Sequence, residues 1–353
     1  MKAWQIMPLV VTSLLLAVWS GWIRIGWNFP VAQSVGQHGA LMVGSFLTTV
    51  ILLERAVTFK NKLVLLLPFI NGCSGVLFVA GYPVLAQYFL LAGSIGFCAM
   101  VLYFIYHYKE LYYYLFFAGA FSLTMGNWLL IKTGFYPVAV PWWMGYLLFT
   151  IVAERLELSR FLRVTTFQQN LLNGSLLIAF IGLLLPFHLY GNIVFAAGLT
   201  LAAVWLFKFD MAIQSIKRAG QHRYSGIVLL AGYVWLLVTA FFLMAGNVNA
   251  FYYDATLHSF FIGFVISMIF SHAPIILPAV LKLPVKPYRP VLYVWFLLMQ
   301  LSLITRMIAD VKAMPLVRKY AGMINGLTLL LFFITIAVVV NGELKKRKRL
   351  VKA

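Results

Sequence analysis

Apolar runs of about 20 residues follow one another along almost the whole chain, separated by short polar connections. A helix of that length rises about 30 Å, which is the thickness of the hydrocarbon core of a bilayer. The pattern predicts twelve membrane-spanning helices, at residues 5–23, 36–54, 62–81, 84–106, 111–131, 138–154, 170–188, 191–208, 224–245, 256–280, 288–309 and 320–341. The predicted fold is an all-α, polytopic membrane helical bundle, with 1–342 as one transmembrane domain and 343–353 as a basic cytoplasmic tail.

Composition supports the membrane prediction, because 63% of the residues are hydrophobic and only 10% are charged. The net charge of +19 does not indicate nucleic-acid binding, because most basic residues lie in the connections that are predicted on one side of the membrane. With the N-terminus inside, 21 of the 27 basic residues fall in inner segments. Both termini are therefore predicted to be cytoplasmic, in the inner (plasma) membrane of a prokaryote. The inner set is Lys2, Arg55, Lys60, Lys62, Lys109, Arg155, Arg160, Arg163, Lys208, Lys217, Arg218, Arg223, Lys282, Lys286, Arg289, Lys345, Lys346, Arg347, Lys348, Arg349 and Lys352.

The basic tail, Lys345 to Arg349, has two interpretations. It is either an anchor beside anionic headgroups of the bilayer or a site for a partner, and the first is favoured. Cys73 and Cys98 lie in apolar runs without the Cys/Cys or Cys/His spacing of a metal site, and we interpret them as buried thiols.

The predicted tenth span carries two histidines, His258 and His272. In a regular α-helix they would lie about 21 Å apart along the axis, with the second side chain pointing about 40° from the first. Ionisable groups inside a bilayer are costly and usually face a bundle interior, a water-filled cavity or a cofactor. The span is therefore predicted to lie centrally in the bundle.

His38 opens the second span, which runs in the same direction as the tenth. His38 and His258 are thus expected at similar depth near the outer surface, each followed by a small residue, Gly39 or Ser259. Two imidazoles from different helices can serve as axial ligands of a b-type haem. Gln37 or Asp254 could then fix an imidazole tautomer. The alternative is that both histidines are buried and hydrogen-bond to neighbouring helices.

Arg306 lies near the outer end of the eleventh span, where basic residues are few. It could bind a haem propionate through its planar guanidinium. The alternative is an interfacial arginine that extends toward the headgroups and pairs with Asp310.

His272 could ligate a second metal centre, relay protons, or hydrogen-bond a carbonyl freed by Pro274 or Pro278. A second haem would need another deep histidine, and His107 is the candidate. His188 and His222 are interpreted as loop residues.

The chain shows no phosphate-binding loop, no catalytic triad order and no paired carboxylates within the spans. The second and sixth spans each end in a Glu-Arg pair, Glu54-Arg55 and Glu154-Arg155, four spans apart. This weak echo hints at three four-helix units.

Twelve spans with histidines opening the second and tenth resemble the NnrS family of haem- and copper-containing membrane proteins. More distantly, the chain resembles subunit I of the haem–copper oxidases. The resemblance implies three four-helix arcs, a low-spin haem between His38 and His258, a propionate contact for Arg306, and copper as a second metal. The sixth span lacks the copper-ligating histidine of the oxidases, and the seventh has only His188, so an oxygen-reducing centre is not expected.

Three hypotheses follow. The first is a haem-binding membrane protein with a nitric-oxide-related or electron-transfer role and a redox partner protein. The second is a small-solute transporter or channel that uses the proline-broken tenth helix. The third is a cofactor-free assembly partner of a respiratory complex.

Overall fold

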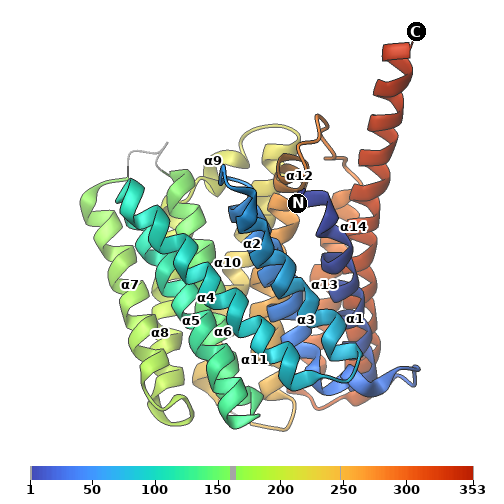
Figure 1. Ribbon diagram of the computed structural model, residues 1–353. Helices are drawn as coiled ribbons and strands as arrows, with labels where there is room; N and C mark the ends of the chain where they lie inside the picture. The colour runs from blue at the N-terminus through green and yellow to red at the C-terminus, as the bar shows by residue number, and fades with distance from the viewer. Residues whose placement is uncertain (1, 160–163, 247, 353) are drawn as a thin grey trace. The chain divides into compact units, whose positions relative to one another are not determined.

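The computed structural model describes residues 2–159, 164–246 and 248–352, so Arg160 and Arg163 of the predicted inner set lie outside the described residues. All regular structure in these ranges is helical (Figure 1). Eleven of the described helices are long and apolar enough to cross a membrane. The remaining predicted span, the second, is divided into shorter helical segments.

The chain forms two compact units, Met1–Phe161 and Leu162–Ala353. The first unit contains the first six predicted spans, and its longest helix is α4. Its elements are η1 (Ala3–Gln5), α1 (Met7–Arg24), η2 (Ala32–Gln37), η3 (Ala40–Thr48), α2 (Thr49–Ala56), η4 (Lys62–Leu65), α3 (Leu66–Val79), α4 (Pro83–Tyr108), α5 (Leu111–Thr133) and α6 (Tyr136–Ser159).

The second unit contains the other six spans. Its last helix, α14, is the longest in the described chain and includes the tail that the sequence set apart. Its elements are α7 (Thr166–Leu184), η5 (Phe187–Gly191), α8 (Asn192–Phe209), α9 (Ala212–Ser215), α10 (Gln221–Ala245), α11 (Tyr252–His258), η6 (Ser259–Ile266), α12 (Ser267–Val280), α13 (Leu292–Val311) and α14 (Pro315–Lys352).

Short-range signals set several helix ends. Pro83 occupies the first turn of α4, where a missing N–H costs nothing. Gly134 ends α5 in the left-handed region, with φ of +62°. Thr165 caps α7 by accepting a hydrogen bond from the backbone N–H of Gln168, whose side chain reaches back to the Thr165 N–H.

Small residues allow the helices of each unit to approach closely. In the first unit, a Cβ on Gly126 of α5 would lie 2.7 Å from Cδ1 of Trp143 in α6. In the second, a Cβ on Gly198 of α8 would lie 2.5 Å from the backbone nitrogen of Ala179 in α7. Close backbone approach of this kind is typical of helix packing in membranes.

The second and tenth predicted spans share an irregularity. Each contains a π-helix directly after its histidine or one residue later, η3 after His38 and η6 after His258. In a π-helix the hydrogen bonds join residues five apart, so each turn holds more residues than an α-turn. The angle between His258 and His272 that was calculated for an unbroken α-helix is therefore wrong for this span.

Candidate functional site

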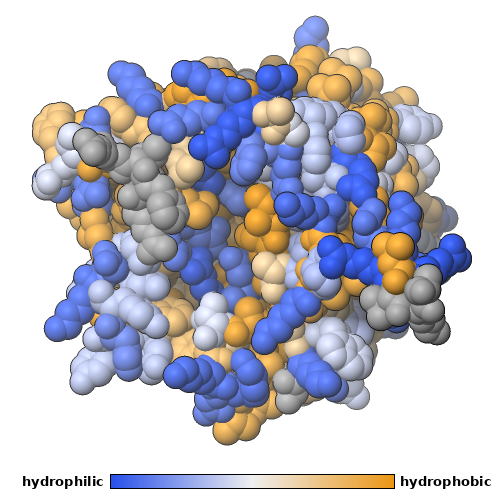
Figure 2. Space-filling view, turned by 90° about the horizontal axis from the view of Figure 1, so that it is seen from above, coloured by the Kyte–Doolittle hydropathy of each residue, from blue (hydrophilic) through white to orange (hydrophobic). Residues whose placement is uncertain are grey.

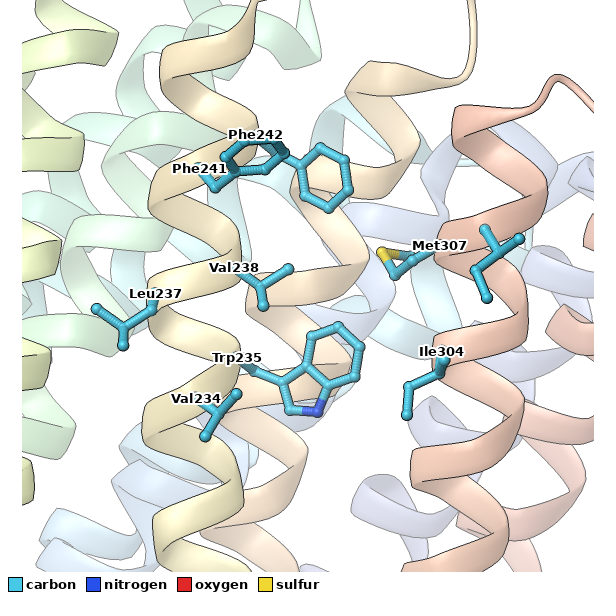
Figure 3. A pocket seen from close by; sticks show the side chains of 9 residues that line it. Val234, Trp235, Leu237, Val238, Phe241, Phe242, Ile304 and Met307 are labelled. Carbon is cyan, nitrogen blue, oxygen red and sulfur yellow. The ribbon is translucent and has the colours of Figure 1, made fainter.

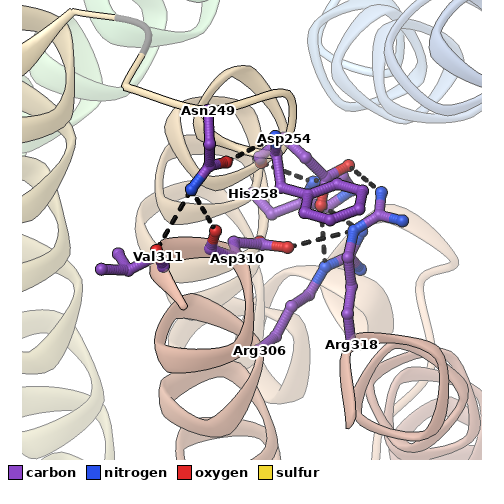
Figure 4. Close-up of polar contacts among 8 residues, drawn as sticks. Asn249, Asp254, His258, Arg306, Asp310, Val311 and Arg318 are labelled. Atoms are coloured by element: carbon purple, nitrogen blue, oxygen red, sulfur yellow. Dashed lines mark hydrogen bonds and ion pairs between the residues drawn. The ribbon is translucent and has the colours of Figure 1, made fainter. Parts of the chain in front are cut away.

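His258 lies at the end of α11 within a cluster of five ionisable side chains from three helices of the second unit (Figure 4). We call this the Asp254 cluster; its members are Asp254 and His258 of α11, Arg306 and Asp310 of α13, and Arg318 of α14. A four-residue separation places Asp254 and His258 on the same face of α11, one turn apart.

The imidazole of His258 is held through its Nδ1 atom. Nδ1 lies 2.9 Å from the backbone oxygen of Asp254 and 3.3 Å from its carboxylate Oδ1. When Nδ1 carries the proton and donates it to these oxygens, Nε2 keeps the lone pair that binds a metal. The sequence named Asp254 as a candidate for fixing the tautomer, and the structure brings its backbone and carboxylate oxygens close to Nδ1.

Two arginines fix the carboxylate of Asp254 in turn. Arg306 donates to Oδ2 from Nη2 and Nε, at 2.7 and 3.1 Å, and Arg318 Nη2 lies 3.0 Å from Oδ1. Arg306 is only 5% exposed. In the alternative interpretation Arg306 pairs with Asp310, but its guanidinium instead donates to the carboxylate of Asp254. The propionate contact of Arg306 stays a prediction.

Arg318 also brings Asp310 into the cluster. Its Nε lies 3.0 Å from Oδ1 of Asp310, an ion pair whose geometry does not make a directed hydrogen bond. Asp254 and Asp310 therefore approach one guanidinium group from two helices. This approach could not be predicted from the sequence, because the two aspartates lie far apart along the chain near span ends and only the packing of α11 and α13 brings them together.

Arg318 is a member that the sequence analysis missed. Nothing near Arg318 in the sequence identifies its partners. The guanidinium also lies over the ring of Phe251, with 4.9 Å between Cζ and the ring centroid. Together these contacts connect α14 to α11 and α13.

His38 is positioned differently, in the first unit. Its Nδ1 lies 2.8 Å from the backbone oxygen of Ala17 in α1. The ring rests against Gly21 of the same helix, where an added Cβ would lie 2.8 Å from Cε1 of the histidine. Gly21 is thus the glycine that makes room for His38, although no pattern in the sequence connects the two residues.

The small residues next to the two histidines are themselves packed. Gly39 faces the rings of Tyr136 and Trp143, with 3.5 and 3.6 Å to an added Cβ. Ser259 is fully buried, donates to the backbone oxygen of Thr256 and accepts from Thr239. Gln37, the other candidate for fixing a tautomer, instead accepts a hydrogen bond from the Tyr136 hydroxyl at 2.5 Å.

His272 lies in α12, with Nδ1 2.8 Å from the backbone oxygen of Met268. His107, which is exposed at the end of α4, makes the same contact with Tyr103 one turn earlier. This local bond therefore does not by itself mark a metal ligand. Behind His258 lie in addition the half-buried carboxylate of Asp254 and the two arginines that contact it. Among the described residues, no group of three or more His, Cys, Asp or Glu side chains is arranged to hold a metal ion.

A second ionic group lies in the first unit, at the predicted inner boundary. Arg55 pairs with Glu154 at 3.2 Å and with Glu157 at 3.3 Å, and its Cζ lies 4.2 Å from the centroid of the Phe116 ring. The Glu-Arg pairs that end the second and sixth spans thus include two residues in contact, Arg55 and Glu154. Their contacts link α2 to α5 and α6 within this unit.

An apolar groove of 430 Å³ lies between α10 and α13 of the second unit (Figure 3). Its lining includes Val234, Val238, Phe241 and Met307, and it contains no titratable group. The indole N–H of Trp235 donates to Gln300 at 2.6 Å, so this polar atom is already used. The apolar lining suits a hydrocarbon chain and provides no side chain for acid–base catalysis.

The family model described as a domain of unknown function, DUF8744, matches residues 4–341. The match covers nearly the whole chain, and the chain therefore belongs to this family. No curated protein and no solved structure matches the chain. The resemblance to the NnrS family and to the haem–copper oxidases, including the three four-helix arcs, stays a prediction.

Proposed function

We propose that this member of the DUF8744 family is an integral membrane protein that binds a b-type haem, with His38 and His258 as axial ligands. The observation that carries the proposal is the Asp254 cluster. A carboxylate behind an imidazole fixes the tautomer, orients the ring and raises the basicity of the ligating nitrogen. Placing such a cluster of charged groups in an apolar helical bundle costs desolvation free energy. We therefore infer that the cluster is kept for a function.

The donor set fits haem iron in its chemistry. Neutral imidazole is the usual axial ligand of low-spin haem, and each proposed ligand has its Nδ1 atom beside a backbone oxygen. A bound haem would supply one-electron chemistry, and a gas such as nitric oxide would bind only by displacing one of the two imidazoles. Arg306 and Arg318 would act through Asp254, because both guanidinium groups contact its carboxylate.

The proposal also assigns roles to Gly39, Ser259 and His272. Gly39 and Ser259 are proposed to leave room beside the ligands for the haem, as small residues next to each histidine. His272 is proposed as a ligand for copper or a second haem, and the measurement below includes it. A redox partner protein and a cytoplasmic location of both termini in a prokaryotic inner membrane remain part of the proposal.

The test is the visible absorption spectrum of protein produced with ample haem and purified in detergent, with iron and copper measured alongside. We expect a Soret band with sharp α and β bands after reduction. His38→Ala or His258→Ala should abolish the low-spin bands, because one imidazole leaves the sixth position open. His188→Ala is the matched control and should leave them unchanged.

His272→Ala separates the subsidiary claims. Unchanged metal content assigns His272 a role other than ligation, and a halved haem content indicates two haems. A loss of copper alone assigns copper to His272. If the wild-type protein lacks haem, or both His38→Ala and His258→Ala keep the native spectrum, the haem proposal fails.

A transporter or channel is the second candidate, favoured by one observation. The tenth span combines a π-helix with two prolines inside α12, Pro274 and Pro278. Interrupted helices of this kind expose backbone groups that can line a solute path. Haem-free protein that catalyses solute flux in vesicles, and loses it on His272→Ala, would support this candidate.

A further inference from the structure

The last helix, α14, continues well past the apolar part of its span. Val340 is the last buried apolar residue of α14 up to Leu350, whereas the helix runs to Lys352. Figure 1 shows this end rising beyond α12 and α13 of the same unit. Five consecutive basic residues, Lys345, Lys346, Arg347, Lys348 and Arg349, are all exposed there. We call these five residues the basic collar.

The collar surrounds the helix. Successive residues are rotated by about 100°, so five in a row distribute positive charge around the whole circumference. They rise about 6 Å along the axis. The headgroup region on each side of a bilayer is about 5–7 Å thick. A protein partner would contact one side of the helix, whereas a headgroup layer contacts a crossing helix on every side.

An ion pair sets the position of the collar within the second unit. Nη2 of Arg289 lies 2.8 Å from Oε1 of Glu343, just before the collar, and Lys346 lies 3.9 Å from the same oxygen. The connection between α12 and α13 therefore contacts α14 directly before the basic collar. The same connection also contains Lys282 and Lys286. This end of the molecule displays hydrophilic side chains (Figure 2).

We propose that the basic collar binds the headgroups of anionic phospholipids in the leaflet on the C-terminal side of the protein. The bound chemistry is the phosphate diester of a lipid with net negative charge, such as phosphatidylglycerol. The proposal is independent of haem binding, because it uses no residue of the Asp254 cluster.

The test uses the full chain reconstituted in phosphatidylcholine vesicles, with spin-labelled phosphatidylglycerol or phosphatidylcholine as probe. The fraction of motionally restricted label reports which lipid contacts the protein. At low salt we expect a several-fold preference for phosphatidylglycerol. The preference should decline toward one near 1 M salt, where the screening length falls to about 3 Å.

Changing all five collar residues to Gln should remove most of this preference. The matched control changes Lys2, Lys60, Lys62, Lys109 and Lys132 to Gln, which removes the same charge from exposed positions in the first unit. This control should keep most of the preference. Equal preferences in the collar variant and the wild type, or an equal loss in the control, would overturn the proposal.

Poor insertion of the fivefold variant would not block the test. The paired variants Lys345→Gln with Lys346→Gln, and Arg347→Gln with Arg349→Gln, remove two charges each and should each lower the preference by part of the full effect. A wild-type preference that persists unchanged at 1 M salt would also contradict the collar, because exposed charges are screened under that condition.

Discussion

At the scale of single residues, the Asp254 cluster shows what spacing alone reveals. Asp254 and His258 lie one helical turn apart, so their contact could be predicted from the sequence of one helix. Arg306 and Arg318 reach the same carboxylate from two helices much farther along the chain. Their pairing depends on how α11, α13 and α14 pack, and no local pattern contains that information.

Arg306→Ala should destabilise the protein by about 2 kcal/mol, because it removes two charge-assisted hydrogen bonds to Asp254 and leaves Arg318 as the remaining guanidinium on that carboxylate. Arg306→Lys should recover only part of the loss, since an ammonium group cannot donate in the planar geometry of a guanidinium. The measurement is thermal unfolding in detergent, followed by helical circular dichroism.

Lys312→Ala is the control for this prediction, because Lys312 is an exposed basic residue just after α13. It should shift the unfolding midpoint little. Equal midpoints for Arg306→Ala and Lys312→Ala would show that the ion pair with Asp254 does not stabilise the fold.

At the scale of elements, hydrophobic runs predicted the spans well and their internal geometry poorly. The tenth span, predicted at 256–280, is observed from Tyr252 to Val280. Helix length follows from the run of apolar residues, which the sequence displays directly. The π-helices were not predicted, because they depend on backbone hydrogen-bond register, and apolar periodicity in a uniformly apolar run does not report it.

Gly263→Ala should destabilise the packing of η6 against α10. The added Cβ would lie 2.5 Å from Cγ of Trp235, whose indole is fixed by its hydrogen bond to Gln300. Overpacking of this kind costs about 1–3 kcal/mol. The unfolding midpoint in detergent measures the effect.

Gly174→Ala in α7 is the matched control, because no heavy atom lies within 4 Å of its added Cβ. It should raise stability slightly, by about 0.5–1 kcal/mol, through the higher helix propensity of alanine. A midpoint for Gly263→Ala at or above that of the wild type would contradict the predicted clash.

At the scale of the whole molecule, the sequence predicted a single bundle of helices, and the structure groups them into two compact units of six predicted spans each. The division follows from which helices share contacts, for example α5 with α6 and α13 with α14. Apolar runs do not encode such choices, because nearly every run is apolar enough to face either lipid or another helix.

An even number of spans predicts that both termini lie on one side of the membrane, and the excess of basic residues predicts the cytoplasmic side. A green fluorescent protein fused after Ala353 should fluoresce, and alkaline phosphatase at the same position should be inactive. Since six spans also precede residue 161, fusions there should behave identically. Active phosphatase at either position would overturn the span count.

The two π-helices have a consequence for comparing members of the family. A π-helix accommodates one residue more than the α-helix that would otherwise connect the same two ends. A relative with regular α-helix at Ala40–Thr48 or Ser259–Ile266 should therefore show a one-residue alignment gap there. If the extra residue serves to orient the preceding histidine, gaps at these two places should coincide with loss of His38 or His258.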